Sequence, residues 1–236
     1  MKNINIVYFA WINEKKNWRN IINGQFLDIV NSNILQYSKI FIEVTCENPN
    51  LVDDVKNLFI NNLVQNNEFD YEIKIHDINH FEYYGIKKLY DLAKLEPDKY
   101  YLYLHSKGIF NYGNIDTRHN NELTLTKGTV YLFKTVLDKF EENQDIMTIG
   151  LFPSNGWNKK FVWFNFFWSR GSYLLTCEDP IISENRYYYE NWLETGKDSL
   201  IYNLYENNFK KYDLHEAGEI LDILAGTFPL EKYNVL

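Results

Sequence analysis

A turn of polar and basic residues directly follows an apolar strand in the middle of the chain. Residues 100–104 (Tyr-Tyr-Leu-Tyr-Leu) fit a sheet interior, and His105, Ser106, Lys107 and Gly108 come next. In an open α/β sheet, ligands bind beyond the carboxyl ends of the strands. A protonated lysine attracts phosphate, and a histidine can donate a hydrogen bond beside it. We therefore expect this turn to bind an anionic group, in preference to forming a solvated turn with a capping serine.

An aromatic stretch, residues 163–168 (Trp-Phe-Asn-Phe-Phe-Trp), holds a second set of candidates. Asn165 is a polar amide among large apolar side chains, and if buried it needs hydrogen-bond partners such as a sugar hydroxyl or a backbone group. Phe166 and Trp168 fit an aromatic core strand better. Aromatic faces with a few polar donors also build carbohydrate sites, so Trp168 stays a candidate sugar contact. Arg170, just past the stretch, can pair with phosphate or carboxylate.

An arginine and a glutamate stand four residues apart on an expected helix over residues 186–193. Two interpretations of this spacing remain open. Arg186 and Glu190 either form a surface ion pair worth a few tenths of a kcal/mol, or Glu190 faces the cleft as a general base.

Several common catalytic and metal-binding patterns do not occur in the sequence. No Gly-x-Gly-x-x-Gly follows the first strand and no Walker-type loop occurs, so a dinucleotide or P-loop enzyme is disfavoured. No Gly-x-Ser-x-Gly elbow of a hydrolase is present. No histidine pair has metal-ligand spacing on one helix, and the two cysteines, Cys46 and Cys177, disfavour a cysteine-based zinc site. We therefore assign no metal ligand.

Charge and hydropathy narrow the class of protein. The 236 residues carry a net charge of −8 without a long Lys/Arg run, which disfavours a nucleic-acid partner. No signal peptide is recognisable, and no apolar stretch approaches the roughly 20 residues that span a bilayer. We expect a cytoplasmic protein without a transmembrane segment.

The elements that position these candidates alternate between strand and helix in the first half. The pattern predicts strands over residues 4–12, 39–45, 71–76 and 100–104, with helices over 18–31, 49–64 and 81–95 between them. This order implies a mostly parallel sheet with right-handed crossovers. The second half predicts a long helix over residues 123–142, a short strand over 147–152 and a helix-like tail from residue 200.

Three short motifs in this order give the chain a family resemblance. The strand end Tyr-Leu-His-Ser-Lys-Gly, the later Asn-Phe-Phe-Trp-Ser-Arg and the spacing of Arg186, Glu190 and Trp192 resemble a group of GT-A-fold glycosyltransferase-like proteins found in large DNA viruses, bacteria and protists. Trp163 and Phe164 stand where that group often has Ser-Gly. The resemblance implies one GT-A-like, three-layer α/β domain over residues 1–236, with a nucleotide-binding half (1–110) and an acceptor-side half (111–236).

The resemblance also implies a donor and its contacts. The expected donor is a nucleotide sugar, a UDP-sugar first of all. The end of the first strand, Ala10, Trp11 and Ile12, would contact the nucleotide base, and Glu43 would bond to base or ribose. Such enzymes usually bind Mn²⁺ or Mg²⁺ through an Asp-x-Asp motif after the fourth strand. The sequence of this chain contains no Asp-x-Asp motif. The basic turn at residues 105–108 stands there instead and is expected to neutralise the leaving diphosphate, partly or wholly replacing the metal.

By the same resemblance, an acidic residue at the start of a late helix deprotonates the acceptor hydroxyl. Glu190 falls at a comparable place, and Asp179 is the second choice. The expected reaction is transfer of a hexose or deoxyhexose to a glycan or glycoconjugate, with inversion. The alternative, supported by the missing Asp-x-Asp, is a non-catalytic glycan- or nucleotide-binding module on a degenerate transferase fold.

Overall fold

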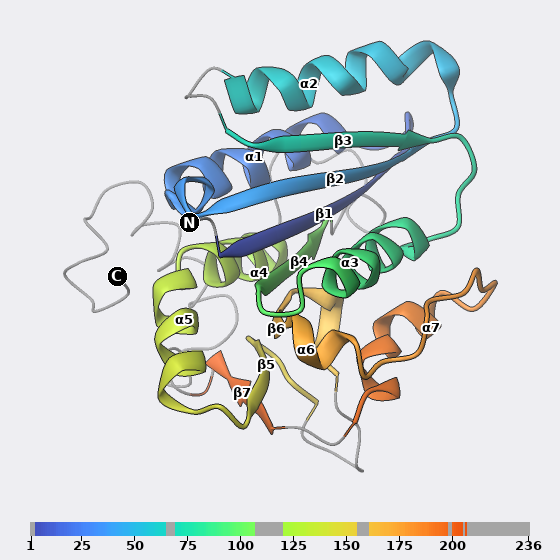
Figure 1. The fold of residues 1–236 in the computed structure, drawn as a ribbon. Helices are drawn as coiled ribbons and strands as arrows, with labels where there is room; N and C mark the ends of the chain where they lie inside the picture. Colours follow the sequence, from blue (N-terminus) through green and yellow to red (C-terminus); the bar gives the residue numbers. More distant parts are fainter. Residues whose placement is uncertain are drawn as a thin grey trace.

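One mixed, mostly parallel sheet forms the centre of the computed structural model, which describes residues 3–64, 69–106, 120–154, 161–197, 200–204 and 206. Within these residues the strand order is β3-β2-β1-β4-β6-β5-β7 (Figure 1). The strands are β1 (Ile4–Ile12), β2 (Ser38–Cys46), β3 (Tyr71–His76), β4 (Tyr100–His105), β5 (Ile146–Gly150), β6 (Phe167–Arg170) and β7 (Leu200–Asn203).

The first four strands are parallel, as their alternation with helices predicts. β2 and β3 lie on one side of β1, and β4 lies on the other. The strand order therefore reverses at the place in the sheet between β1 and β4. Eight of the nine residues of β1 are buried, as expected for a strand covered on both faces. The carboxyl ends of these four strands therefore share one edge of the sheet, called here the carboxyl edge.

The other three strands extend the sheet beyond β4. β6 is antiparallel to both β4 and β5, and β7 is parallel to β5. The helix-like tail predicted from residue 200 is wrong at its start, because Leu200–Asn203 is a strand. Its backbone groups pair with the open edge of β5, which a helix would leave unpaired.

Helices flank both faces of the sheet. The α-helices are α1 (Trp18–Asn31), α2 (Val52–Val64), α3 (Tyr83–Leu95), α4 (Asn120–Val130), α5 (Phe133–Glu142), α6 (Gly171–Leu174) and α7 (Tyr187–Glu190). Short 3-10 helices are η1 (Ile34–Gln36), η2 (Pro49–Leu51), η3 (Trp163–Asn165) and η4 (Trp192–Thr195). Among the described residues, no helix is both long and apolar enough to cross a membrane.

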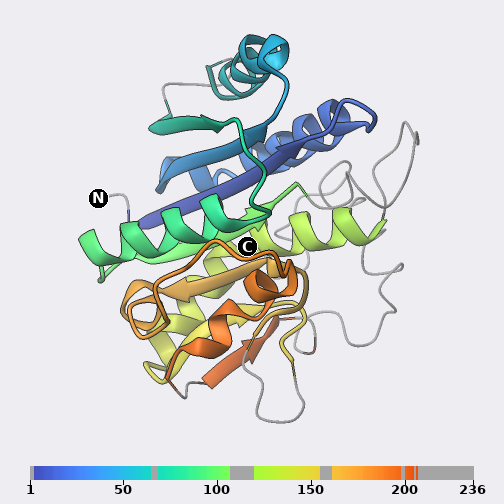
Figure 2. The ribbon, with the colours of Figure 1, turned by 90° about the vertical axis from the view of Figure 1, so that its right-hand side faces the viewer.

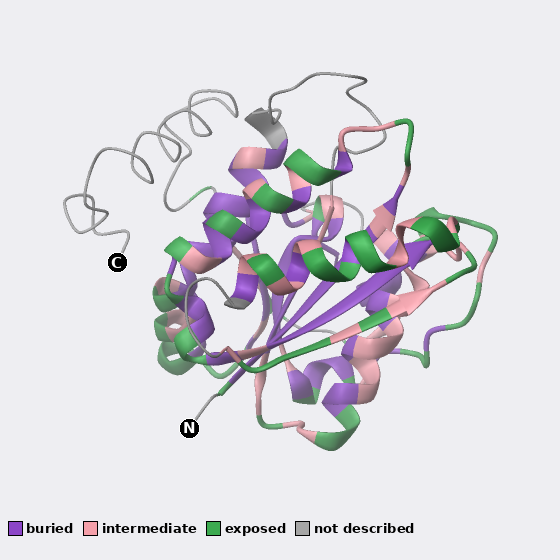
Figure 3. Cartoon of the chain, turned by 90° about the horizontal axis from the view of Figure 1, so that it is seen from above, coloured by how far each residue is buried: buried purple, intermediate pink, exposed green. Residues whose placement is uncertain are grey.

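Two buried clusters divide the helices between the faces. One cluster joins the sheet to α1, α2, α4 and α5, and the other joins it to α3, α6 and α7. Figure 2 shows α6 and α7 (orange) on the same side of the sheet as α3. In Figure 3 the central strands are largely buried, and the helices carry their exposed residues on the outer side. The sheet thus has a hydrophobic core on each of its two faces.

The single helix predicted over residues 123–142 is wrong, because the structure has two. α4 ends at Val130 and α5 begins at Phe133, after Leu132 leaves helical geometry with ψ at 12°. α4 packs against α1, whereas α5 packs against β5. A change of direction at this point lets each segment bury its apolar face against a different element.

Candidate functional site

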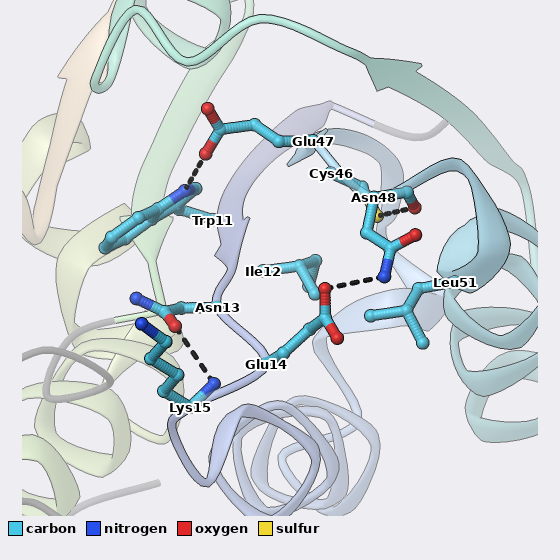
Figure 4. Close-up of a pocket in the computed structure, with 9 residues that line it drawn as sticks. All are labelled: Trp11, Ile12, Asn13, Glu14, Lys15, Cys46, Glu47, Asn48 and Leu51. Carbon is cyan, nitrogen blue, oxygen red and sulfur yellow. Dashed lines mark hydrogen bonds between the residues drawn. The ribbon is translucent and has the colours of Figure 1, made fainter.

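A pocket opens at the carboxyl edge above β1 and β2, and Figure 4 shows its lining. Its volume is about 350 Å³, within the range of small-molecule sites, roughly 300–1,000 Å³. We call it the Trp11 pocket. The lining residues are Trp11, Ile12, Asn13, Glu14, Lys15, Cys46, Glu47, Asn48 and Leu51.

Hydrogen bonds hold the polar side chains of the Trp11 pocket in place. The indole Nε1 of Trp11 donates to Glu47 Oε2 at 3.2 Å, and Asn48 Nδ2 donates to Glu14 Oε1 at 2.6 Å (Figure 4). The Cys46 thiol donates to the carbonyl of Asn48, and burial raises its pKa, so it stays a neutral part of the wall. An aromatic wall with carboxylates and amides at its rim suits a flat ligand that carries hydrogen-bond donors.

A serine joins this pocket to the end of β4. The Ser106 hydroxyl accepts a hydrogen bond from the Trp11 backbone N–H at 3.3 Å, and the Ser106 N–H donates to the Phe9 carbonyl at 2.9 Å. His105, the last residue of β4, pairs with Phe9 of β1 and so lies at the point where the strand order reverses. This is the place where ligands bind in doubly wound α/β sheets.

A second group of polar side chains lies beside His105, and we call it the Glu82 cluster: Glu82, Tyr103, His105 and Asn165. Glu82 Oε2 accepts from the Tyr103 hydroxyl at 3.0 Å and from Asn165 Nδ2 at 2.9 Å. Glu82 Oε1 lies 3.9 Å from His105 Nδ1. Asn165 Nδ2 also donates to the carbonyl of Tyr189 at 3.1 Å.

The ends of three separate elements position this cluster. Glu82 occupies the N-cap position of α3, where a negative charge suits the helix dipole. His105 is the last residue of β4, and its Nε2 donates to the Phe164 carbonyl at 2.9 Å. Asn165 lies in η3, just before β6, and is only 1% exposed. The hydrogen-bond partners that the sequence required for a buried Asn165 are thus a carboxylate and a backbone carbonyl.

Left-handed backbone conformations gather around the Glu82 cluster. Phe81 has a φ of 53°, Phe164 of 70° and Asn165 of 53°. This conformation costs a non-glycine residue roughly 1–2 kcal/mol. A hydrogen bond from the Phe81 N–H to Asn79 Oδ1 at 2.9 Å supports the first of them. Strain of this kind persists where the surrounding structure enforces it, and it is concentrated at functional sites.

A glycine in α3 lets Tyr103 reach Glu82. A Cβ atom on Gly85 would lie 2.8 Å from Phe9 Cβ and 2.9 Å from the Tyr103 hydroxyl. Helix and sheet can therefore approach closely enough for the hydrogen bond to form. Burial, and next the neighbouring Glu82 carboxylate, raise the pKa of Tyr103 well above its usual value, so the phenol stays protonated and donates.

Glu43 is bound to another protein side chain. It is 4% exposed, and its Oε2 lies 2.6 Å from His76 Nε2. The imidazole of His76 in turn stacks on Tyr84, with ring centroids 3.5 Å apart. The expected contact with base or ribose would need Glu43 to exchange this partner. Ala10 is fully buried in the core, so of the expected base contacts only Trp11 and Ile12 line the pocket.

The structure does not bring Trp168 and Arg170 to the carboxyl edge. Trp168 is fully buried, and its Nε1 donates to the carbonyl of Thr129 at 3.1 Å, which makes it a core residue. Arg170 pairs with Tyr100, at the opposite end of β4 from His105. Its guanidinium donates to backbone carbonyls, one of them that of Ile146 at 2.9 Å. The expected ligand contact of Trp168 is wrong because its side chain is buried in the core. That of Arg170 is wrong because β6 is antiparallel to β4, which places Arg170 at the end of β4 away from His105.

The two candidate bases lie in different surroundings. Asp179 is bound on the outer side of α3 by Lys87 and Lys94, each at 3.0 Å, and these hydrogen bonds lower its pKa. Asp179 therefore forms surface ion pairs with α3, and we do not expect it to act as the base. Glu190 is half-buried and directly follows Tyr189, whose carbonyl binds Asn165. Within the described part of the chain it forms no ion pair with Arg186.

The sequence missed Glu82 and Glu47. Neither belongs to a recognised motif, and each is one of many acidic residues in the chain. The available signal was positional, since Glu82 begins the helix after the third strand and Glu47 directly follows the second. Lys107 and Gly108 lie outside the described residues, so the structure says nothing of their predicted roles.

No metal-holding cluster of three His, Cys, Asp or Glu residues is found in the ranges that the structure describes. Glu82 and His105 supply two such side chains, and the other two members of the cluster, the phenol of Tyr103 and the amide of Asn165, both donate hydrogen bonds to Glu82.

No model of a known protein family matches the chain, and no curated protein matches it at significant similarity. What the chain does must therefore be inferred from the residues and geometry of its carboxyl edge.

Proposed function

We propose that the chain is a glycosyltransferase of GT-A-like fold, which transfers a sugar from a nucleotide-sugar donor to a hydroxyl of a glycan acceptor. One observation carries the proposal. A pocket of about 350 Å³ with an aromatic wall lies next to a polar cluster, and Ser106 joins the two at the β1/β4 reversal point. The chemistry of this arrangement suits a ligand with a flat base at one end and a sugar at the other.

The charges along the edge suggest how the donor lies. The charged residues that line the Trp11 pocket are two glutamates, Glu14 and Glu47, and one lysine, Lys15, so its net negative charge favours the hydrogen-bond donors of a nucleoside over phosphate. The diphosphate would then meet the basic turn, where Lys107 and His105 neutralise its charge. The sugar comes to lie over the Glu82 cluster.

The chemistry follows from this placement. Glu190 accepts the proton of the acceptor hydroxyl, whose oxygen attacks the anomeric carbon of the sugar. The bond between that carbon and the diphosphate oxygen breaks, and the nucleoside diphosphate leaves with the electron pair. Its developing charge is stabilised by the basic turn.

Donor binding is tested first by thermal shift with UDP-, GDP-, CMP- and dTDP-sugars, because any ligand of the native state raises its stability. We expect one nucleotide class to raise the melting temperature, and Trp11→Ala to abolish the shift. If no member of the panel binds, the proposed function is wrong.

Catalysis is tested by release of the nucleoside diphosphate from the binding donor, with and without Mn²⁺. The Glu190→Gln variant should bind donor as the wild type does and lose transfer. Lys107→Ala should lose donor binding. Donor binding without turnover under any condition would instead support the non-catalytic nucleotide-binding module.

A further inference from the structure

The two oxygens of the Glu82 carboxylate are used unequally. Oε2 accepts two hydrogen bonds, from Tyr103 and from Asn165. Oε1 accepts none from the residues that the structure describes, and its ion-pair distance of 3.9 Å to His105 Nδ1 exceeds a hydrogen bond. The Glu82 side chain is 15% exposed, so a ligand at the carboxyl edge can reach it.

The direction of Oε1 is fixed before any ligand arrives. A rotation of the Glu82 carboxylate would break the hydrogen bonds from both Tyr103 and Asn165. Tyr103 is fully buried and Asn165 is also tied to the carbonyl of Tyr189, so neither donor can follow such a rotation. A group held in this way binds a partner with little loss of conformational entropy.

The chemistry of Oε1 selects the kind of group that it binds. A carboxylate oxygen accepts hydrogen bonds and repels phosphate. A neutral hydroxyl can approach it, and hydrogen bonds to a charged acceptor are the stronger ones. We propose that Glu82 Oε1 accepts a hydrogen bond from a ring hydroxyl of the bound sugar and thereby selects which sugars are used.

This inference rests on the proposed function for its donor, and it adds the substrate class. The sugar must carry a hydroxyl at the ring position that faces Glu82. A site built around a hydrogen bond rejects an analogue that lacks the hydroxyl, because the polar group is then left without its partner. Sugars deoxygenated at that position are therefore poor ligands of this chain, and sugars deoxygenated elsewhere are not.

The variant Glu82→Gln tests the proposal because its neighbours dictate how the amide lies. The donors from Tyr103 and Asn165 require an oxygen at the Oε2 position. The amide nitrogen of the new side chain must therefore take the place of Oε1, which turns a charged acceptor into a neutral donor. Glu96→Gln is the matched control, because Glu96 lies at the other end of α3 and binds Asn5 and Lys99.

The measurement is calorimetric binding of three probes: the free nucleoside diphosphates, the corresponding nucleotide sugars with their monodeoxy analogues, and the methyl glycosides of the same sugars. The ratio of the affinity for the nucleotide sugar to the affinity for the free nucleotide is the gain from the sugar. This gain should fall at least about tenfold in Glu82→Gln. The affinity for the free nucleotide should not change, and Glu96→Gln should behave as the wild type. If Glu82→Gln does not fold, Tyr103→Phe removes one donor and should lower the same gain about two- to tenfold.

The outcomes separate this inference from the proposed function. If the nucleotide binds but the gain from the sugar is equal in wild type and variant, the role of Glu82 is overturned and the proposed function survives. If no nucleotide binds but a methyl glycoside binds the wild type and not the variant, Glu82 recognises sugar and the proposed donor is wrong. Failure of every probe overturns both.

Discussion

Asn165 ties three segments together, and replacing it measures how strongly the Glu82 cluster is held. Its amide nitrogen donates to Glu82 Oε2 at 2.9 Å and to the Tyr189 carbonyl at 3.1 Å, from a backbone with a φ of 53°. Asn165→Gly removes both hydrogen bonds and tolerates the left-handed backbone. A buried hydrogen bond to a charged group contributes about 1.5–3 kcal/mol and a neutral one about 1 kcal/mol, so we expect a loss of about 3 kcal/mol.

Calorimetric melting converts this loss into a temperature. For a chain of this size each kcal/mol lowers the melting temperature by about 2–4 °C, which predicts a decrease of about 6–12 °C for Asn165→Gly. Asn165→Ala loses the same hydrogen bonds and adds left-handed strain. After allowance for the greater freedom of glycine in the unfolded chain, we expect alanine to be about 1 kcal/mol less stable than glycine.

Two results would refute this reasoning. If Asn165→Gly melts at the wild-type temperature, the amide does not hold the cluster. If the alanine variant is as stable as the glycine variant, the native backbone at this position is not strained.

Three further predictions concern packing and ion pairing in α3 and the core. Gly85→Ala places a methyl group 2.9 Å from the Tyr103 hydroxyl. We expect the free energy of unfolding, measured by chemical denaturation, to fall by about 1–3 kcal/mol. An unchanged denaturation midpoint would contradict the close packing. Trp168→Phe should lower the free energy of unfolding by about 2 kcal/mol and leave the affinity for the donor unchanged. Weaker donor binding would show that Trp168 contributes to the binding site. The hydrogen bond from Lys99 lowers the pKa of Glu96 below its usual 4.5, so its contribution to stability is full above that pH and lost as the pH falls through the lower folded value. Glu96→Gln should flatten this part of the stability curve against pH, and an unchanged acid slope would argue against the pairing.

The first half of the fold could be predicted because its signals are local. The continuous apolar run of β1 and the helical spacing of α1 each lie within one short window of sequence. The strand at residues 71–76 was also found at its observed bounds. The second half was harder, because the break at Leu132 and the strand at Leu200–Asn203 depend on what each segment packs against.

The candidate site was only partly predictable for the same reason. His105 and Asn165 were singled out from their neighbours in sequence, as a polar turn after a strand and as an amide among aromatic residues. The residue that joins them, Glu82, is 23 positions before one and 83 before the other, so no sequence window contains all three. Their contact exists only because the ends of β4 and η3 and the start of α3 meet at one edge.

The sequence by itself determined the alternating strands and helices, the parallel first half of the sheet and the polar strand end at residue 105. Apolar periodicity and turn chemistry act over a few residues, so a linear pattern is enough to record them. Tertiary structure alone decided which side chains share the carboxyl edge. Arg170 shows the physical reason: β6 is antiparallel to β4, so its last residue lies opposite Tyr100 and far from His105. The direction in which a strand joins a sheet is set by its partners, and no pattern within the strand encodes it.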